Sequence, residues 1–270
     1  MLFECKKVSF GYENQQVIKD LSFSYPGTDK LVLKDINMDV AEGEFVSILG
    51  QSGCGKSTLL RLLAGLEKQT SGEILIDGKP FSGPSLSRGV VFQDYGLFPW
   101  MTAGENIMLA LRQRFPERDK KELREVAVNM LQSVGLDKGV YNKLPKELSG
   151  GMKQRCAIAR AFGIDPPILL MDEPFGALDA QTRTQLQTEL LETWEREKKT
   201  CFFITHDVEE AIILAQRVII MSARPGRIKD IVDVNIPYPR TQETKLTPEF
   251  NELKNHIWSQ VYQEYLAVRK

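Results

Sequence analysis

Short apolar runs alternate along this chain with amphipathic stretches, and that alternation is typical of α/β proteins. Continuous apolar runs of strand length, as expected for buried parallel strands, occupy residues 44–49, 168–171, 201–204 and 217–222. From residue 102 to about 164 the apolar positions instead recur at helical spacing, as in the stripe over 123–134. We therefore predict an α/β fold with a mixed sheet and a helical subdomain inserted at roughly 95–165.

The two ends of the chain follow other patterns. The first forty residues alternate like the strands of an antiparallel β subdomain, and they contain a weak repeat in which residues 8–20 are echoed by 21–35. At the other end, Thr247 and Pro248 predict the start of a closing helix. The apolar positions of that helix, which we expect to pack on the body of the domain, are Phe250, Leu253, Ile257, Val261 and Tyr265.

Residues 50–58 carry the strongest chemical signal. They match G-x-x-x-x-G-K-[ST], a phosphate-binding loop, with a predicted strand before them and a helix predicted over 58–65 after them. Glycines let such a loop wrap so that its N–H groups point at phosphate oxygens, and the helix adds the positive end of its dipole. An incidental glycine-rich turn is the alternative, which the flanking strand and helix disfavour. The residues predicted to bind the nucleotide here are Gly50, Ser52, Gly53, Cys54, Gly55, Lys56, Ser57 and Thr58.

Several polar side chains have the right chemistry to act on a bound triphosphate. Lys56 supplies a charge for the terminal phosphates, and the Ser57 hydroxyl can ligate Mg²⁺. Asp172, at the end of a buried strand, can hold Mg²⁺ opposite Ser57, and Glu173 can orient or deprotonate the attacking water. An acidic pair at this position could instead cap a helix, but the combination with the phosphate loop favours the metal role.

Two further side chains are predicted at strand ends. Gln93 ends a strand expected over 89–93 and can reach both metal and water, while His206 follows the strand over 201–204 and can touch the γ-phosphate. A single histidine is more often structural. The position of His206 nevertheless favours a functional role, because open α/β sheets bind ligands at the carboxyl ends of their strands.

A second anion-binding element precedes the helix predicted from Met152. Ser149, Gly150 and Gly151 lead into that helix, whose first N–H groups suit a phosphate. One nucleotide already occupies the first loop, so the second element hints at a phosphate supplied from another subunit.

Length, charge and cysteine content narrow the class of protein. At 270 residues the chain fits one large domain or one domain with a small appendage, and its net charge of −1 gives no basic field to recruit nucleic acid. Residues 1–7 lack the order of a signal peptide, and no apolar run approaches the ~20 residues needed to span a bilayer. The four scattered cysteines predict reduced thiols in a cytosolic compartment.

In order and spacing, these motifs resemble those of the ATP-binding subunits of ABC transporters. The resemblance spans about residues 20–235 and rests on residues 50–58, Gln93, 148–155, 169–174, 177–179 and His206. It implies a P-loop NTPase core and a head-to-tail dimer, in which each ATP lies between the phosphate loop of one copy and Ser149, Gly150 and Gly151 of the other. The residue roles that it implies are Glu173 as general base, His206 on the γ-phosphate, Asp179 in the dimer contact, Gln154 in the nucleotide-binding set and Gln93 as a metal ligand linking hydrolysis to the permease.

An aromatic side chain normally stacks on adenine about 25 residues before the phosphate loop in this family. Tyr25 lies at that spacing from Gly50, whereas Tyr12 lies 38 residues before it. The spacing favours Tyr25, although the repeat keeps Tyr12 open as the alternative.

Within the family, residues 84–93 and 97–102 followed by Glu105 and Asn106 resemble the importers of nitrate, sulfonate, taurine and bicarbonate. That resemblance implies a cassette over 1–235 and a helical tail over 236–270, bound peripherally at the cytoplasmic side of the cell membrane. ATP and Mg²⁺ are the expected cofactors. The expected partners are a second copy, a transmembrane permease that meets residues 97–100 and an extracytoplasmic solute-binding protein, with no nucleic acid.

Two rival functions are weighed against ATP-driven import. A non-transport mechanical ABC ATPase is the main alternative. Proteins of that class commonly have a second cassette, a coiled-coil insert or a basic face, and this sequence shows none of these features. A nucleotide-dependent binding module without turnover is disfavoured by the intact Glu173 and His206. The solute, the identity of the permease and the choice between homodimer and heterodimer stay open.

Overall fold

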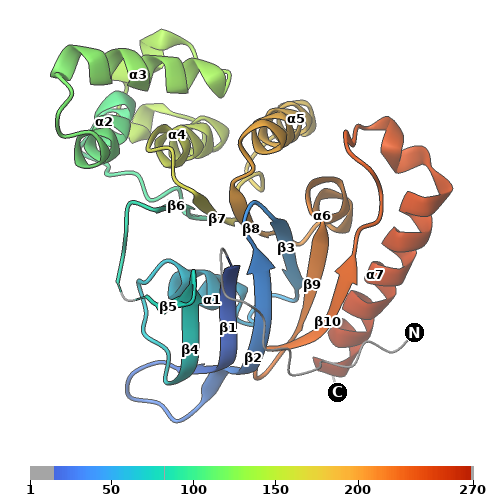
Figure 1. Ribbon diagram of the computed structural model, residues 1–270. Helices are drawn as coiled ribbons and strands as arrows, with labels where there is room; N and C mark the ends of the chain where they lie inside the picture. The colour runs from blue at the N-terminus through green and yellow to red at the C-terminus, as the bar shows by residue number, and fades with distance from the viewer. Residues whose placement is uncertain (1–14, 82, 269–270) are drawn as a thin grey trace.

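The computed structural model of the chain describes residues 15–81 and 83–268 (Figure 1). Its strands are β1 (Gln15–Ser24), β2 (Leu31–Ala41), β3 (Phe45–Gly50), β4 (Ser71–Ile76), β5 (Lys79–Pro80), β6 (Arg88–Val91), β7 (Ile168–Asp172), β8 (Thr200–Ile204), β9 (Arg217–Ser222) and β10 (Arg227–Asp233). Its α-helices are α1 (Lys56–Leu63), α2 (Ala103–Arg114), α3 (Lys120–Ser133), α4 (Gly150–Gly163), α5 (Ala180–Glu197), α6 (Val208–Leu214) and α7 (Pro248–Val268). Short 3₁₀ helices are η1 (Lys138–Asn142), η2 (Pro145–Glu147) and η3 (Glu243–Leu246).

A six-stranded mixed sheet forms the centre of the fold. Its strand order is β10-β9-β3-β8-β7-β6, and every neighbouring pair is parallel except β10 with β9. Because β6, β7, β8 and β3 run in the same direction, their carboxyl ends meet along one edge of the sheet. Segments that follow these four strands are therefore brought together, although they are far apart in the sequence.

The central sheet is covered on both faces, which explains why its strands are continuously apolar. Along β3, Val46 and Ile48 pack with α1 and the first two strands, whereas Phe45 and Leu49 pack with the helices of the opposite face. This alternation is the two-residue period of a strand. The predicted buried parallel strands are thus explained by two hydrophobic layers meeting on one sheet.

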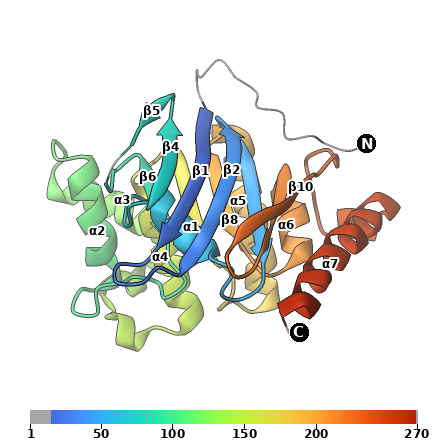
Figure 2. The ribbon, with the colours of Figure 1, turned by 90° about the horizontal axis from the view of Figure 1, so that it is seen from below.

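A second, antiparallel sheet has the order β2-β1-β4-β5 and lies on the side of α1 (Figures 1 and 2). The predicted fold class, an α/β P-loop core with an N-terminal antiparallel sheet and a mixed main sheet, is confirmed. The predicted repeat, in contrast, does not form two equivalent units, because residues from both copies lie in the single strand β1. Residues 8–14 of the first copy lie outside the described part of the chain.

Helices α2, α3 and α4 pack together as a separate layer beyond the end of the central sheet (Figure 1). The loop that leads into α2 is fixed by two side chains. Thr102 and Glu105 form a capping box, and the buried Asn106 donates to the carbonyls of Phe98, Met101 and Thr102 while accepting from the Phe98 N–H at 2.7 Å. The loop over 97–100 is consequently held in place while Trp100 stays 72% exposed.

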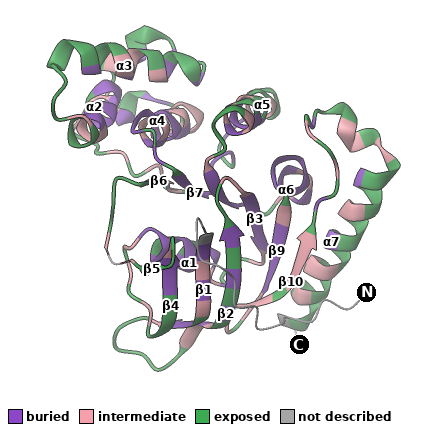
Figure 3. Cartoon of the chain, viewed as in Figure 1, coloured by how far each residue is buried: buried purple, intermediate pink, exposed green. Residues whose placement is uncertain are grey.

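The closing helix α7 lies along the outer edge of the sheet, beside β9 and α6 (Figures 1 and 2). Phe250 and Ile257 are fully buried there, and Leu253 and Val261 pack against the same core, as predicted, whereas Tyr265 is 38% exposed. Figure 3 shows the exposed outer face of α7. In the described residues, the helices do not combine the length and the apolar character that crossing a membrane requires.

Arg240 fastens the segment before α7 to the body. Its buried guanidinium donates to the carbonyls of Ile212, Ala215, Val234 and Ile236 at 2.5–3.1 Å. These carbonyls include two at the end of α6, where a helix leaves acceptors without partners. The start of the tail is therefore tied to the helix that follows His206.

Candidate nucleotide site

The phosphate loop connects the central strand β3 to helix α1. Gly53 and Gly55 have φ of 78° and 97°, values that favour glycine, and a Cβ on Gly55 would lie 2.5 Å from the Leu33 side chain. The helix begins at Lys56, not at Thr58 as predicted, because the last residues of the loop already form its first turn. Their N–H groups therefore lie at the positive end of the helix dipole.

Lys56 reaches back across this loop. Its side chain is 92% buried, and its ammonium group donates to the carbonyls of Gly50 at 2.8 Å and Gln51 at 3.0 Å. An ammonium group has three protons, so these two bonds leave one donor for a ligand. The loop thus holds the positive charge at the position where terminal phosphates would lie.

Asp172 and Ser57 meet beside the loop. Burial raises the pKa of the Asp172 carboxyl above its usual value, and the neighbouring Ser57 hydroxyl acts in the opposite direction. Oxygen donors of this kind suit Mg²⁺. The described residues contain no cluster of three or more acidic, histidine or cysteine side chains that could enclose a metal.

Glu173, Gln93 and His206 converge on one point. The Glu173 carboxylate accepts from the Gln93 amide at 3.3 Å, and its same oxygen lies 3.4 Å from His206 Nδ1. Glu173 itself has φ 46°, an uncommon backbone angle for a residue with a side chain, and its N–H donates to the Ile204 carbonyl of β8 at 2.9 Å. The adjacent strands β7 and β8 therefore determine where the carboxylate points.

Gln93 reaches this point from a loop. Strand β6 ends at Val91, so the prediction that Gln93 ends its strand was wrong. The two additional residues carry its amide to the Glu173 carboxylate.

Most of the predicted site residues line one cleft, which has a volume of about 500 Å³. The residues that line it are Val32, Gly50, Ser52, Gly53, Gly55, Lys56, Ser57, Thr58, Gln93, Glu173 and His206. Cys54 is buried under the loop, and Asp172 lies at the end of β7 beside Ser57. Val32 was not predicted, because nothing in its apolar type separates it from an ordinary strand residue.

Tyr25 lies next to the cleft at the end of β1. Its hydroxyl is 3.1 Å from the Thr58 hydroxyl, and its ring packs edge-on against Phe23 with 4.9 Å between ring centroids. Tyr25 is 38% exposed, so part of it is in contact with solvent. Tyr12 lies outside the described residues.

The residues of the second predicted anion element do not reach the cleft. Ser149 caps α4 by accepting from the Met152 N–H, and Asp179 caps α5 by accepting from Thr182, whose hydrogen bonds lower the pKa of that carboxyl. Both side chains are exposed. Gln154, which also belongs to α4, is buried. One chain therefore leaves Ser149, Gly150, Gly151 and Asp179 away from its own phosphate loop.

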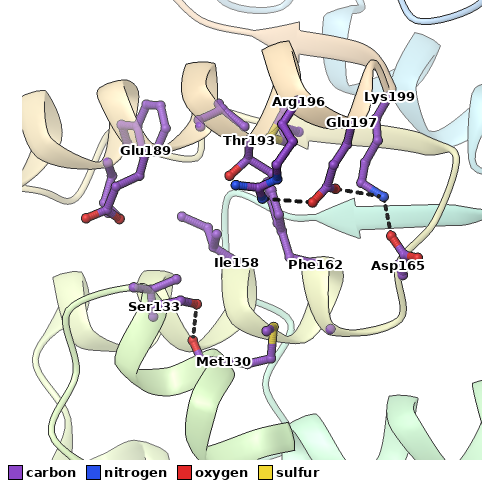
Figure 4. Close-up of a pocket in the computed structure, with 16 residues that line it drawn as sticks. Met130, Ser133, Ile158, Phe162, Asp165, Glu189, Thr193, Arg196, Glu197 and Lys199 are labelled. Atoms are coloured by element: carbon purple, nitrogen blue, oxygen red, sulfur yellow. Dashed lines mark hydrogen bonds and ion pairs between the residues drawn. The ribbon is translucent and has the colours of Figure 1, made fainter.

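A second cavity, of about 320 Å³, lies between α3 and α4 on one side and α5 on the other (Figure 4). Its interior is apolar, with Ile158 and Phe162 from α4. At one end Lys199 lies between Asp165 and Glu197, as the dashed lines in Figure 4 show. Its lining contains none of the predicted site residues, so this cavity is separate from the nucleotide cleft.

Comparison with known proteins gives consistent results. A family model described as ABC transporter matches residues 33–176. The chain is 47% identical over 265 residues to an uncharacterized ABC transporter ATP-binding protein of Methanocaldococcus jannaschii, covering 98% of this chain and 95% of that protein. It is 48% identical to the aliphatic sulfonates import ATP-binding protein SsuB of Bacillus cereus, covering 85% and 88%.

A solved structure shares the fold. It is an ATP-binding cassette in a dimeric post-hydrolysis state bound to ADP and Pi, with a TM-score of 0.75 and 33% sequence identity, covering 82% of this chain and 100% of that one. The resemblance inferred from the sequence motifs is therefore confirmed. This chain belongs to the ABC transporter family, as one of its ATP-binding proteins.

Proposed function

We propose that this chain is the ATP-hydrolysing subunit of an ABC importer. One observation carries the proposal: the Glu173 carboxylate, the Gln93 amide and the His206 ring come together in the cleft that the phosphate loop opens into. A protein that only held a nucleotide would need the loop but not this polar group. The arrangement suits attack by water on a terminal phosphate.

Each residue has a distinct part in the proposed reaction. The loop N–H groups and Lys56 bind the phosphates, and Tyr25 stacks on the base. Glu173 takes a proton from the attacking water, while His206 contacts the γ-phosphate and Gln93 orients the water. Ser57, Asp172 and Gln93 would hold Mg²⁺, which when bound neutralises charge on the phosphate oxygens.

The proposed site is completed by a second copy of the chain. Ser149, Gly150, Gly151, Gln154 and Asp179 lie away from the phosphate loop of their own chain, which supports a role in another copy's site. The similar cassette that was solved with ADP and Pi is itself a dimer. In a head-to-tail arrangement, the N-terminus of α4 would face the terminal phosphate bound by the partner.

The transport role rests on the relatives and on one exposed loop. A relative that is 48% identical to this chain is named for aliphatic sulfonate import, which supports a small sulfonate-like solute. Phe98 and Trp100 are exposed on a loop that Asn106 holds through hydrogen bonds. This loop is suited to contact a permease at the cytoplasmic side of the membrane. An extracytoplasmic binding protein would supply the solute to that permease. We propose a cassette over residues 1–235, with its helical subdomain at about 95–165, and a tail over 236–270.

Phosphate release by the purified wild-type chain tests the enzymatic part of the proposal. We expect steady-state hydrolysis of ATP that requires Mg²⁺ and stops when the ion is chelated, because the phosphates need a counter-charge in the transition state. Repeating the assay with the permease that is co-expressed separates transport from other uses of ATP. Binding of ATP with no phosphate release, alone or with the permease, would indicate a binding module instead.

A further inference from the structure

A buried carboxylate lies close to the candidate nucleotide site without touching it. Glu210, on α6, is 94% buried, and both of its oxygens have donors. One accepts from the Thr205 hydroxyl, and the other accepts from the Gln187 amide of α5 at 2.8 Å. Burial raises the pKa of Glu210. An ionisable side chain in such a position costs stability unless its partners are retained, so an apolar residue would be the simpler choice for mere packing.

The hydrogen bonds of Thr205 extend this contact to the backbone around His206. A threonine hydroxyl has one proton, and because Glu210 takes it, the oxygen's lone pairs are left to accept. They accept from the Asp207 N–H at 3.1 Å. Thr205 and Asp207, the two neighbours of His206, are thereby joined to each other and to Glu210.

The imidazole ring of His206 makes few contacts with the other described residues. Its side chain is 69% exposed, and the contact that the structure shows for its ring is the 3.4 Å approach to Glu173. The direction of an exposed ring with few contacts depends on the backbone that carries it. The Thr205–Asp207 backbone is in turn held by Glu210 through the Thr205 hydroxyl, and by the hydrogen bond from the Thr205 N–H to the Ile48 carbonyl of β3 at 3.3 Å.

We propose that Glu210 is a positioning residue, which holds His206 beside Glu173 through Thr205. This inference rests on the proposed ATPase function for the role of His206. Through Gln187, Glu210 also connects this turn to α5, the helix that Asp179 caps. The position of His206 is thereby linked to the helix that begins at the proposed dimer contact.

Histidine NMR can test the position of His206 without turnover. The chain has two histidines, and His256→Gln leaves only His206 to observe. The imidazole ¹⁵N and ¹H shifts of His206 are then compared, without nucleotide, in this background and with Glu210→Leu, Glu210→Gln or Thr205→Val added. Circular dichroism and thermal melting identify variants that fold. Glu209→Gln is the matched control, because Glu209 is the preceding residue but pairs with Lys245 and Lys254 at the surface.

We expect Glu210→Leu and Thr205→Val to move the His206 signals toward those of a freely exposed imidazole. In ATPase assays they should lower kcat about 10- to 100-fold, with a smaller change in KM for ATP, as for a small misplacement of a reacting group. Glu210→Gln should keep the signals, because its amide oxygen still accepts from Thr205 and the Gln187 amide can turn to face its nitrogen. Glu209→Gln should change neither readout.

Three results would overturn the inference. The first is that His206 shifts stay the same in a folded Glu210→Leu or Thr205→Val variant. The second is a fall in kcat without any movement of the His206 signals, and the third is an equal effect from Glu209→Gln. A wild-type chain that hydrolyses no ATP would instead refute the proposed function, and the NMR comparison would still decide whether Glu210 positions His206.

Discussion

Replacing Glu173 with glutamine is expected to lower the rate of ATP hydrolysis by about 10²- to 10⁴-fold, the usual contribution of a general base. Glutamine has the same shape, so the contacts with Gln93 and His206 can form, but its amide cannot accept a proton from water. Nucleotide affinity should change little, because the phosphates are bound by the loop. Phosphate release and ATP titration, measured on the same preparation, separate these two effects.

The control for this variant is Glu192→Gln, which removes an exposed carboxylate from α5. Its hydrolysis rate should match that of the wild type. If Glu173→Gln hydrolysed ATP at a rate within a few-fold of the control, Glu173 would not be the base, and another group in the cleft would have to activate the water.

Lys56→Ala should weaken nucleotide binding as well as slow hydrolysis. The Lys56 ammonium is buried and bonded to two carbonyls of the loop, and among the described residues that line the cleft there is no other lysine or arginine to replace its charge. A hydrogen bond to a charged group contributes about 1.5–3 kcal/mol. We therefore expect the Kd for ATP to rise about 10- to 150-fold, measured by titration calorimetry.

Lys68→Ala is the matched control for that titration. Lys68 is exposed just after α1, and its removal changes the net charge by the same amount. A comparable rise in the Kd for ATP in both variants would show that the affinity depends on the net charge of the protein and not on the ammonium group held by the loop.

Local motifs were enough to predict the phosphate loop and the acidic pair. Residues 50–58 and Asp172 with Glu173 are each contiguous, so their chemistry is visible without knowledge of the fold. The meeting of Gln93 with Glu173, 80 residues apart, follows once β6, β7 and β8 are known to be parallel neighbours. That strand order depends on packing across the whole domain, and the motifs do not encode it.

The buried polar network around His206 could not be predicted. Glu209 and Glu210 are adjacent acidic residues in the first turn of α6, where acidic side chains usually face solvent near a helix N-terminus. In the fold, Glu210 is buried and accepts from the Gln187 amide of α5, whereas Glu209 pairs with Lys254 at the surface. The sequence does not show which of the two adjacent acidic residues faces inward.

The central claim is that each site is built from two copies of the chain, and mixing two inactive variants tests it most directly. Lys56→Ala damages the phosphate loop. Ser149→Asp keeps a residue able to cap α4 but places a negative charge where the partner's phosphate would lie. In a head-to-tail heterodimer, one site combines the intact loop of one variant with the intact α4 end of the other. We predict that an equal mixture recovers about a quarter of wild-type hydrolysis, since half of the dimers carry one intact site of two. A mixture no more active than its separate components would contradict the shared site.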